Sequence, residues 1–186
     1  MASYDMEMLA AARLLGKREA GQRGRLSSAR VRRSISTTYY ALFHFIVDEV
    51  GRLLIGTTND TRTRRRILAR TITHSGITTA LDKIRGQNAD LSIEDFVRMG
   101  NGIGNVQPPE FAKEFARVFS DAKSKRHDAD YNLNENLGEK DAQLLHNRAK
   151  RVIKDWRSAT AKSDRDFKKA LCLLILLKGK LRSDAA

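Results

Sequence analysis

The stretch Ser36–Leu54, STTYYALFHFIVDEVGRLL, is the longest segment of the chain with a helical pattern of apolar residues. The apolar positions of this pattern are Ile35, Tyr39, Leu42, Phe43, Ile46, Val50, Leu53 and Leu54. Their spacings of three and four put them on one broad face of a helix. Because further apolar side chains (Tyr40, Ala41, Phe45 and Val47) lie on its other sides, we expect this helix to be covered from more than one direction, at the centre of the core.

The composition around this segment predicts an all-α fold. The chain has 186 residues and only two prolines, Pro108 and Pro109, and it is rich in alanine, leucine, arginine, lysine and glutamate. These residues favour helices, whereas the alternation of β-branched residues that is typical of strands is scarce. A chain of this length is most simply one domain with a buried core.

Flanking segments repeat the helical pattern. We expect a first helix at Tyr4–Ala20, broken by Gly21 and Gly24, with Ser27 or Ser28 capping the next helix. Short helices are predicted over Thr61–Arg70, Ile77–Ile84 and Ser92–Met99, with interruptions at Thr73–Gly76 and Gly100–Gly104. Strong helices are predicted to start at Pro109 and to cover Glu139–Ala159. The apolar run Leu171–Leu177 fits a short buried helix or a strand by periodicity, and we prefer a helix.

The excess of positive charge points to a polyanionic partner. With 35 lysine and arginine residues against 22 acidic ones, the formal charge is +13. Nucleic acid is the first partner to consider, an acidic membrane surface the second and an acidic protein the third, while a merely solvated basic surface is the alternative. Arg62, Arg64, Arg65 and Arg66 suit phosphate contacts, as do Lys123 and Lys125.

The lone cysteine and the N-terminus favour the cytoplasm. Cys172 has no second cysteine to pair with, and its apolar neighbours predict a buried, inert thiol. The N-terminus carries acidic residues and no long apolar stretch, unlike a secretory signal. The run Ala170–Leu177 is too short to span a bilayer. We therefore expect a cytoplasmic protein that does not bind membranes.

Several kinds of catalytic site are not supported by the sequence. The four histidines are scattered, and neither an HExxH spacing nor a cysteine pair is present, so we expect no metal and no cofactor. The glycines of GNGIGN follow no predicted strand and precede no Walker lysine, which favours a turn over a phosphate-binding loop. The most informative polar cluster is Arg126–Tyr131, RHDADY, at the end of a strong core helix.

Three segments together resemble the HEPN domain (higher eukaryotes and prokaryotes nucleotide-binding), in particular its small stand-alone prokaryotic members. Ser36–His44 is similar to a signature of a small residue followed by Tyr-Tyr-Ala-x-Phe-His. Thr73–Gly76 is similar to Thr-His-x-Gly, and Arg126–Tyr131 to Arg-x-x-x-Asp-Tyr. The three occur in the expected order and the resemblance covers about residues 5–157. It implies a HEPN-like domain at 1–157. The tail from Ser158 onward lies outside the resemblance, and we expect this basic and apolar extension at 158–186 to pack on the domain or on a partner.

The resemblance implies an up-and-down helical bundle, often in a dimer. Together with the helical patterns above, it predicts about five main helices plus a C-terminal apolar helix. Many members of the superfamily are metal-independent ribonucleases with an Arg-x4-6-His motif, and several are toxins paired with nucleotidyltransferase antitoxins. In such a site the histidine transfers a proton and the arginine stabilises the charge on phosphorus. Here Tyr131 stands where the motif has histidine, and His127 directly follows Arg126, so that the two side chains of a helix point in different directions.

The candidate site therefore has two interpretations. In the first, the chain binds RNA or a nucleotide in a toxin–antitoxin or phage-defence system, as a ribonuclease with Arg126, His127, Asp130, Tyr131 and His74 as catalytic residues. In the second, the chain is a catalytically inactive interaction module, and the same residues form a buried polar network. Tyr39, Tyr40 and His44 support the site in either case, and we expect Tyr39 or Tyr40 to contact the Arg126–Tyr131 segment.

Overall fold

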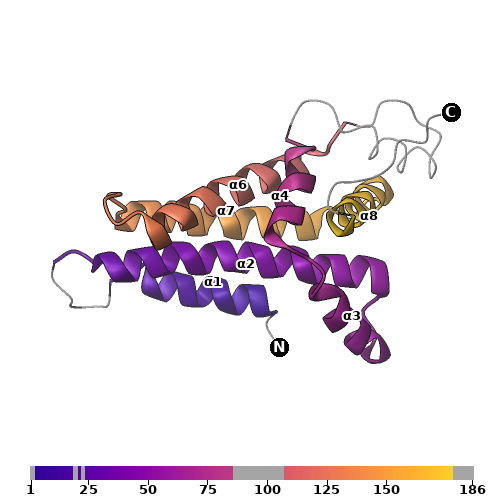
Figure 1. Ribbon diagram of the computed structural model, residues 1–186, viewed down its shortest axis with the longest axis horizontal. Coiled ribbons are helices and arrows are strands. Elements are labelled where there is room, and N and C mark those ends of the chain that lie inside the picture. The colour runs from indigo at the N-terminus through magenta and orange to yellow at the C-terminus, as the bar shows by residue number, and fades with distance from the viewer. Residues whose placement is uncertain (1–2, 19–20, 22–23, 86–106, 178–186) are drawn as a thin grey trace. The chain divides into compact units, whose positions relative to one another are not determined.

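The computed structural model describes residues 3–18, 21, 24–85 and 107–177, and this part of the chain is all-α (Figure 1). It contains seven α-helices, one short 3-10 helix at Asn59–Thr61 and no strand. The α-helices are α1 (Tyr4–Leu15), α2 (Ser28–Ile55), α3 (Arg62–Ala69), α4 (His74–Asp82), α6 (Glu110–Tyr131), α7 (Glu139–Ser158) and α8 (Lys162–Leu176). None of these described helices is long and apolar enough to cross a membrane.

The chain divides into two compact units. The first unit comprises residues 1–45 and 117–155, and the second comprises residues 46–116 and 156–186. By residue number, α2, α6 and α7 each contribute to both units.

The core of the first unit comes from α1, from the N-terminal part of α2 and from those parts of α6 and α7 that belong to this unit. Its buried apolar side chains include Leu9, Ala12, Ile35, Tyr39, Leu42, Val118, Phe119, Ala122, Leu145, Ala149 and Val152. Figure 1 shows α1 alongside α2. The two helices are tied by Ser34, whose hydroxyl donates to the carbonyl of Ala12 over 2.8 Å.

Gly16, at the end of α1, allows this close approach of α1 to α2. A Cβ atom at Gly16 would lie 2.6 Å from the Ser34 Oγ and 3.3 Å from its Cβ. Gly16→Ala is therefore expected to displace Ser34, to break its hydrogen bond to Ala12 and to lower the free energy of unfolding by about 1–3 kcal/mol, as measured by urea denaturation.

Gly138→Ala is the matched control, because a Cβ there would make only an ordinary contact of 3.6 Å with Asp141. The double variant Gly16→Ala/Ser34→Ala removes the clashing hydroxyl and should lose less stability than the two single variants together. Equal losses in Gly16→Ala and Gly138→Ala would contradict this explanation.

The core of the second unit is built around Trp156. Its indole ring is fully buried and packs against Phe111 and Phe115, with ring centroids 5.5 and 5.1 Å away. The indole Nε1–H donates to the Glu49 carboxylate over 2.9 Å. In the same unit α4 contacts α8, and the apolar face of α8 is buried.

Lys168 of α8 caps the C-terminal end of α7 in the second unit. Its side chain is 5 % exposed, and its ammonium donates to the carbonyls of Trp156 and Ala159 over 2.6 and 2.5 Å. Carbonyls at the end of a helix have no partner in their own helix, so a buried cation there both satisfies them and complements the helix dipole. Burial lowers the pKa of Lys168. From the sequence, Lys168 was only a charged flank of an apolar run.

Several sequence predictions are confirmed and others need correction. Ser27 accepts a hydrogen bond from the Arg30 amide, and the last segment is a helix, in which Cys172 is fully buried and burial raises its pKa. The first helix ends at Leu15 instead of Ala20, because Gly16 closes it. The predicted interruption at Thr73–Gly76 is the start of α4, since the Thr73 hydroxyl accepts from the Gly76 amide as an N-cap. The predicted Ser92–Met99 helix and the Gly100–Gly104 turn lie outside the described residues.

Candidate functional site

The candidate site lies in the first unit, where the end of α6 meets a polar stripe on α2 that consists of Arg32, Ser36 and Tyr40. Arg126 of α6 donates from Nη2 to the Tyr40 hydroxyl over 3.2 Å. Its Nε lies 2.7 Å from an oxygen of Asp130, one helical turn further on. This contact between Tyr40 and the Arg126–Tyr131 segment confirms the one that the sequence predicted.

Two tyrosine rings surround the Arg126 guanidinium. Its Cζ atom lies 5.7 Å from the ring centroid of Tyr40 and 5.4 Å from that of Tyr131. Partial burial by itself lowers the pKa of Arg126, but the surrounding phenol and carboxylate oxygens raise it above its ordinary value. The guanidinium is therefore a permanent positive charge whose side chain is 25 % exposed.

The Arg126 Nε is buried and its N–H is not directed at a hydrogen-bond acceptor among the described residues. The short distance to Asp130 is thus an ion pair without a well-aligned hydrogen bond. Since a buried donor without an acceptor costs free energy, this part of the guanidinium is poorly satisfied in the free protein.

Asp130 is held from α2 as well as by Arg126. The Ser36 hydroxyl donates to the Oδ1 atom of Asp130, while the Oδ2 atom faces Arg126. The carboxylate therefore bridges a hydroxyl of α2 and a guanidinium of α6. This arrangement fixes the rotamer of Arg126 from one side.

Arg32 holds the end of α6 from the same face of α2. Its guanidinium donates to five backbone carbonyls of α6 and the following loop, those of Asp128, Ala129, Asn132, Leu133 and Glu135, over 2.8–3.3 Å. The last carbonyls of a helix lack partners within it, and a cation at that end also complements the helix dipole. Arg32 thus positions the backbone that carries Arg126 and Tyr131.

The sequence interpretation missed the roles of Arg32 and of the Ser36 hydroxyl. The signal was present, because Arg32, Ser36 and Tyr40 follow one another at intervals of four and so share one face of α2. Apolar periodicity does not detect a stripe of polar residues.

Tyr131 connects Arg126 with His127. The Tyr131 ring, which is 66 % exposed, lies 5.2 Å from the ring of His127, in addition to its contact with Arg126. From their neighbouring positions we expected the side chains of Arg126 and His127 to point in different directions. Both nevertheless contact the same ring, that of Tyr131. An exposed imidazole, a phenol and a guanidinium stand together at the surface.

Tyr39 and His44 are packing residues next to this cluster. Tyr39 is buried against Tyr40 and Phe119, and burial raises its pKa to about 12, although the charge of Arg126 offsets part of the effect. The ring of His44 packs against those of Tyr4 and Phe43, and burial lowers its pKa. At neutral pH Tyr39 therefore keeps its proton and His44 is uncharged.

The other predicted site residues are distributed over both units. Lys123 and Lys125 precede Arg126 on α6 in the first unit, and Lys123 is exposed. His74 and the arginines of α3 belong to the second unit, where His74 opens α4 with an exposed side chain. Arg62, Arg64 and Arg66 are exposed on α3.

Arg65 differs from the other arginines of α3. Its Nη1 donates to the carbonyls of Gly56 and Thr58 over 2.7 and 3.2 Å, and to the hydroxyl of Thr61 over 2.6 Å. This guanidinium stabilises the turn between α2 and α3. Arg65 is therefore less available for a phosphate than its exposed neighbours.

Across the described residues, no group of three or more histidine, cysteine, aspartate or glutamate side chains is arranged to hold a metal ion. Comparisons with models of known protein families, with curated proteins and with solved structures find no match to this chain.

Proposed function

We propose that this chain is a HEPN-like RNA-binding protein that cleaves RNA without a metal ion, as a cytoplasmic component of a toxin–antitoxin or phage-defence system. In this proposal the helices form an up-and-down bundle that dimerises, and the segment at 158–186 packs on the bundle or on a partner. The protein partner is a nucleotidyltransferase antitoxin or another defence protein. The single observation that carries the proposal is the cluster of Arg126, His127 and Tyr131, in which a partly buried permanent cation lies beside the phenol of the exposed Tyr131, and this phenol contacts the exposed imidazole of His127.

These three side chains supply what RNA cleavage by the adjacent 2′-hydroxyl requires. The 2′-oxygen attacks phosphorus, the bond to the 5′-oxygen breaks, and the products carry a 2′,3′-cyclic phosphate and a 5′-hydroxyl. Arg126 stabilises the negative charge that builds up on the phosphate oxygens. His127 gives a proton to the leaving 5′-oxygen, and solvent takes the proton of the 2′-hydroxyl. Tyr131 positions the phosphate between them.

Incubating the purified protein with total RNA in EDTA tests this proposal. We expect cleavage in the wild type and a loss of about 10²–10³-fold in Arg126→Ala, as found when a charge-stabilising donor is removed. His127→Ala should lose about as much, because a general acid contributes about 10²–10⁴-fold. Arg33→Ala, which removes an exposed arginine of α2, is the matched control.

Absence of cleavage, or equal cleavage in Arg126→Ala and the control, would reject the ribonuclease. End-group analysis is a second check, because a 5′-phosphate on the products would exclude attack by the 2′-hydroxyl.

A specific observation also favours the catalytically inactive interaction module. Arg126 is already engaged by Asp130, which is in turn held by Ser36, and such a network stabilises a fold without chemistry. In that case the excess charge binds nucleic acid or an acidic protein. A nucleic-acid-binding module should bind an RNA oligonucleotide without cleaving it, and its affinity should fall steeply as the salt concentration rises. If RNA does not bind at any salt concentration, an acidic protein remains as the partner.

A further inference from the structure

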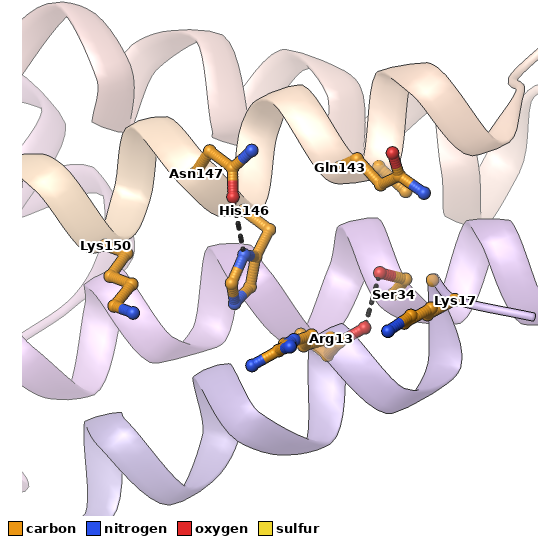
Figure 2. Close-up of a pocket in the computed structure, with 10 residues that line it drawn as sticks. Arg13, Lys17, Ser34, Gln143, His146, Asn147 and Lys150 are labelled. Atoms are coloured by element: carbon orange, nitrogen blue, oxygen red, sulfur yellow. Dashed lines mark hydrogen bonds between the residues drawn. The ribbon is translucent and has the colours of Figure 1, made fainter.

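A polar pocket lies in the first unit, between α1, α2 and α7. It has a volume of about 330 Å³, which is in the range of pockets that bind small molecules. It shares no lining residue with the cluster around Arg126. Its cations come from two sides, as Figure 2 shows: Arg13 lies on α1, Lys17 lies in the turn that follows α1, and Lys150 lies on α7.

The charges around this pocket all have the same sign. Arg13, Lys17 and Lys150 are exposed, and no carboxylate is among the described residues that line it. Within the described part of the chain none of the three cations has an ion-pair partner. Three like charges around one cavity repel each other, so an anion placed between them gains attraction and also relieves that repulsion.

The walls of the pocket are fixed and polar. The buried His146 lies 3.1 Å from the Leu9 carbonyl through its Nε2, so this nitrogen carries the proton and the ring is anchored to α1. Its Nδ1 lies 3.3 Å from the Oδ1 of Asn147 (Figure 2). The carbonyl of Ala12 accepts from the Ser34 hydroxyl and from the Gly16 amide. Because both lone pairs of this oxygen have donors, the Ala12 carbonyl does not present a free acceptor to an anion.

The lining also limits the kind of anion. Apart from the anchored ring of His146, no aromatic side chain is among the described lining residues, so a nucleobase would find no surface for stacking. Gln143 and Asn147 add amide groups (Figure 2). The Gln143 amide nitrogen already donates to Glu139 over 2.9 Å, and the Asn147 Oδ1 lies 3.3 Å from the His146 Nδ1. The amide oxygen of Gln143 and the amide nitrogen of Asn147 can hydrogen-bond to hydroxyls of a ligand. A compact ligand with phosphate and hydroxyl groups matches this combination of cations and amides.

We propose that the pocket between α1, α2 and α7 binds a small phosphate ester, of the size of a phosphorylated sugar, through Arg13, Lys17 and Lys150. This proposal does not depend on the RNA-binding function, because the two sites use different residues.

Isothermal titration calorimetry of the full chain tests the proposal with four probes. Ribose 5-phosphate and inorganic pyrophosphate should bind, ribose without phosphate should not, and adenosine monophosphate should bind no more tightly than ribose 5-phosphate. The variant Arg13→Gln/Lys17→Gln/Lys150→Gln should lose at least about tenfold in affinity for ribose 5-phosphate, or about 1.4 kcal/mol.

Two further variants separate the pocket from general charge and from the other site. Arg33→Gln/Lys162→Gln/Lys169→Gln removes the same number and types of exposed cations elsewhere and should bind ribose 5-phosphate as the wild type does. Arg126→Ala should also bind it normally, whatever its effect on RNA.

The proposal is overturned if neither ribose 5-phosphate nor pyrophosphate binds, or if the two triple variants lose affinity equally. It is also overturned if adenosine monophosphate binds much more tightly than ribose 5-phosphate, since the base would then carry recognition. A last outcome would also overturn it. If Arg13→Gln/Lys17→Gln/Lys150→Gln binds ribose 5-phosphate as the wild type does but loses affinity for an RNA oligonucleotide without terminal phosphates, the three cations serve RNA and not a small phosphate ester.

Discussion

Trp156→Ala is expected to lower the free energy of unfolding of the second unit by about 3–5 kcal/mol, the usual cost of removing a buried aromatic ring from a core. The ring is fully buried against Phe111 and Phe115, and a cavity would remain in its place. The substitution also removes the donor to Glu49, whose side chain is only 15 % exposed, and so leaves a largely buried carboxylate oxygen without its indole partner. Urea denaturation followed by circular dichroism measures the loss, because Trp156 is the only tryptophan and its fluorescence disappears in the variant.

Trp156→Phe separates packing from the hydrogen bond. It keeps a buried ring but lacks the N–H, so its loss should be clearly smaller than that of Trp156→Ala. Leu144→Ala is the matched control on α7, because that side chain is 58 % exposed. A loss in Trp156→Ala no larger than in Leu144→Ala would show that the ring is not buried as described.

Arg32→Ala is expected to lower the free energy of unfolding by about 2–4 kcal/mol, since hydrogen bonds to a charged group contribute about 1.5–3 kcal/mol and several are lost together. Five carbonyls at the end of α6 and in the loop after it lose their common donor. Arg32→Lys keeps the charge but offers only three donors on one nitrogen, so it should recover part of the stability and not all of it. Urea denaturation of the two variants measures both effects.

The neighbouring Arg33 provides the control for Arg32. Arg33 is exposed on the same helix, and Arg33→Ala should change the stability by less than about 0.5 kcal/mol, as expected for a surface substitution. Hydrogen exchange of the amides of residues 132–135 should be faster in Arg32→Ala and unchanged in Arg33→Ala. Unchanged exchange in Arg32→Ala would contradict the role of Arg32 in holding the loop.

The helical fold class followed from the sequence because apolar spacing is a local property. The pattern from Ile35 to Leu54 identified the helix that contributes Tyr39, Leu42 and Ile46 to the core, and all three are buried. Helix ends were less accurate, since they depend on single caps. Gly16 ends α1 before the predicted Ala20, and Thr73 begins α4 within a segment that was expected to interrupt the pattern.

The contacts of the candidate site were only partly visible in the sequence. The contact of Tyr40 with the Arg126 segment was predicted, because motif order placed the two segments together. The five-carbonyl contact of Arg32 was not, since backbone acceptors have no signature in the sequence. The buried amine of Lys168 was missed for the same reason, because its partners are carbonyls at the end of α7.

By itself the sequence determined the all-α class, the apolar faces of the main helices, the burial of Cys172 and the positive charge. These properties depend on composition and on spacing along one helix. Only the tertiary structure decided which cations bind backbone carbonyls and which remain exposed to a ligand. Arg32 and Lys168 cap the C-terminal ends of helices, and Arg65 stabilises a turn. Arg13, Lys17 and Lys150 surround a pocket. The physical reason is that a lysine or arginine takes its role from the acceptors within reach of its charge, and those acceptors come from segments distant in the chain.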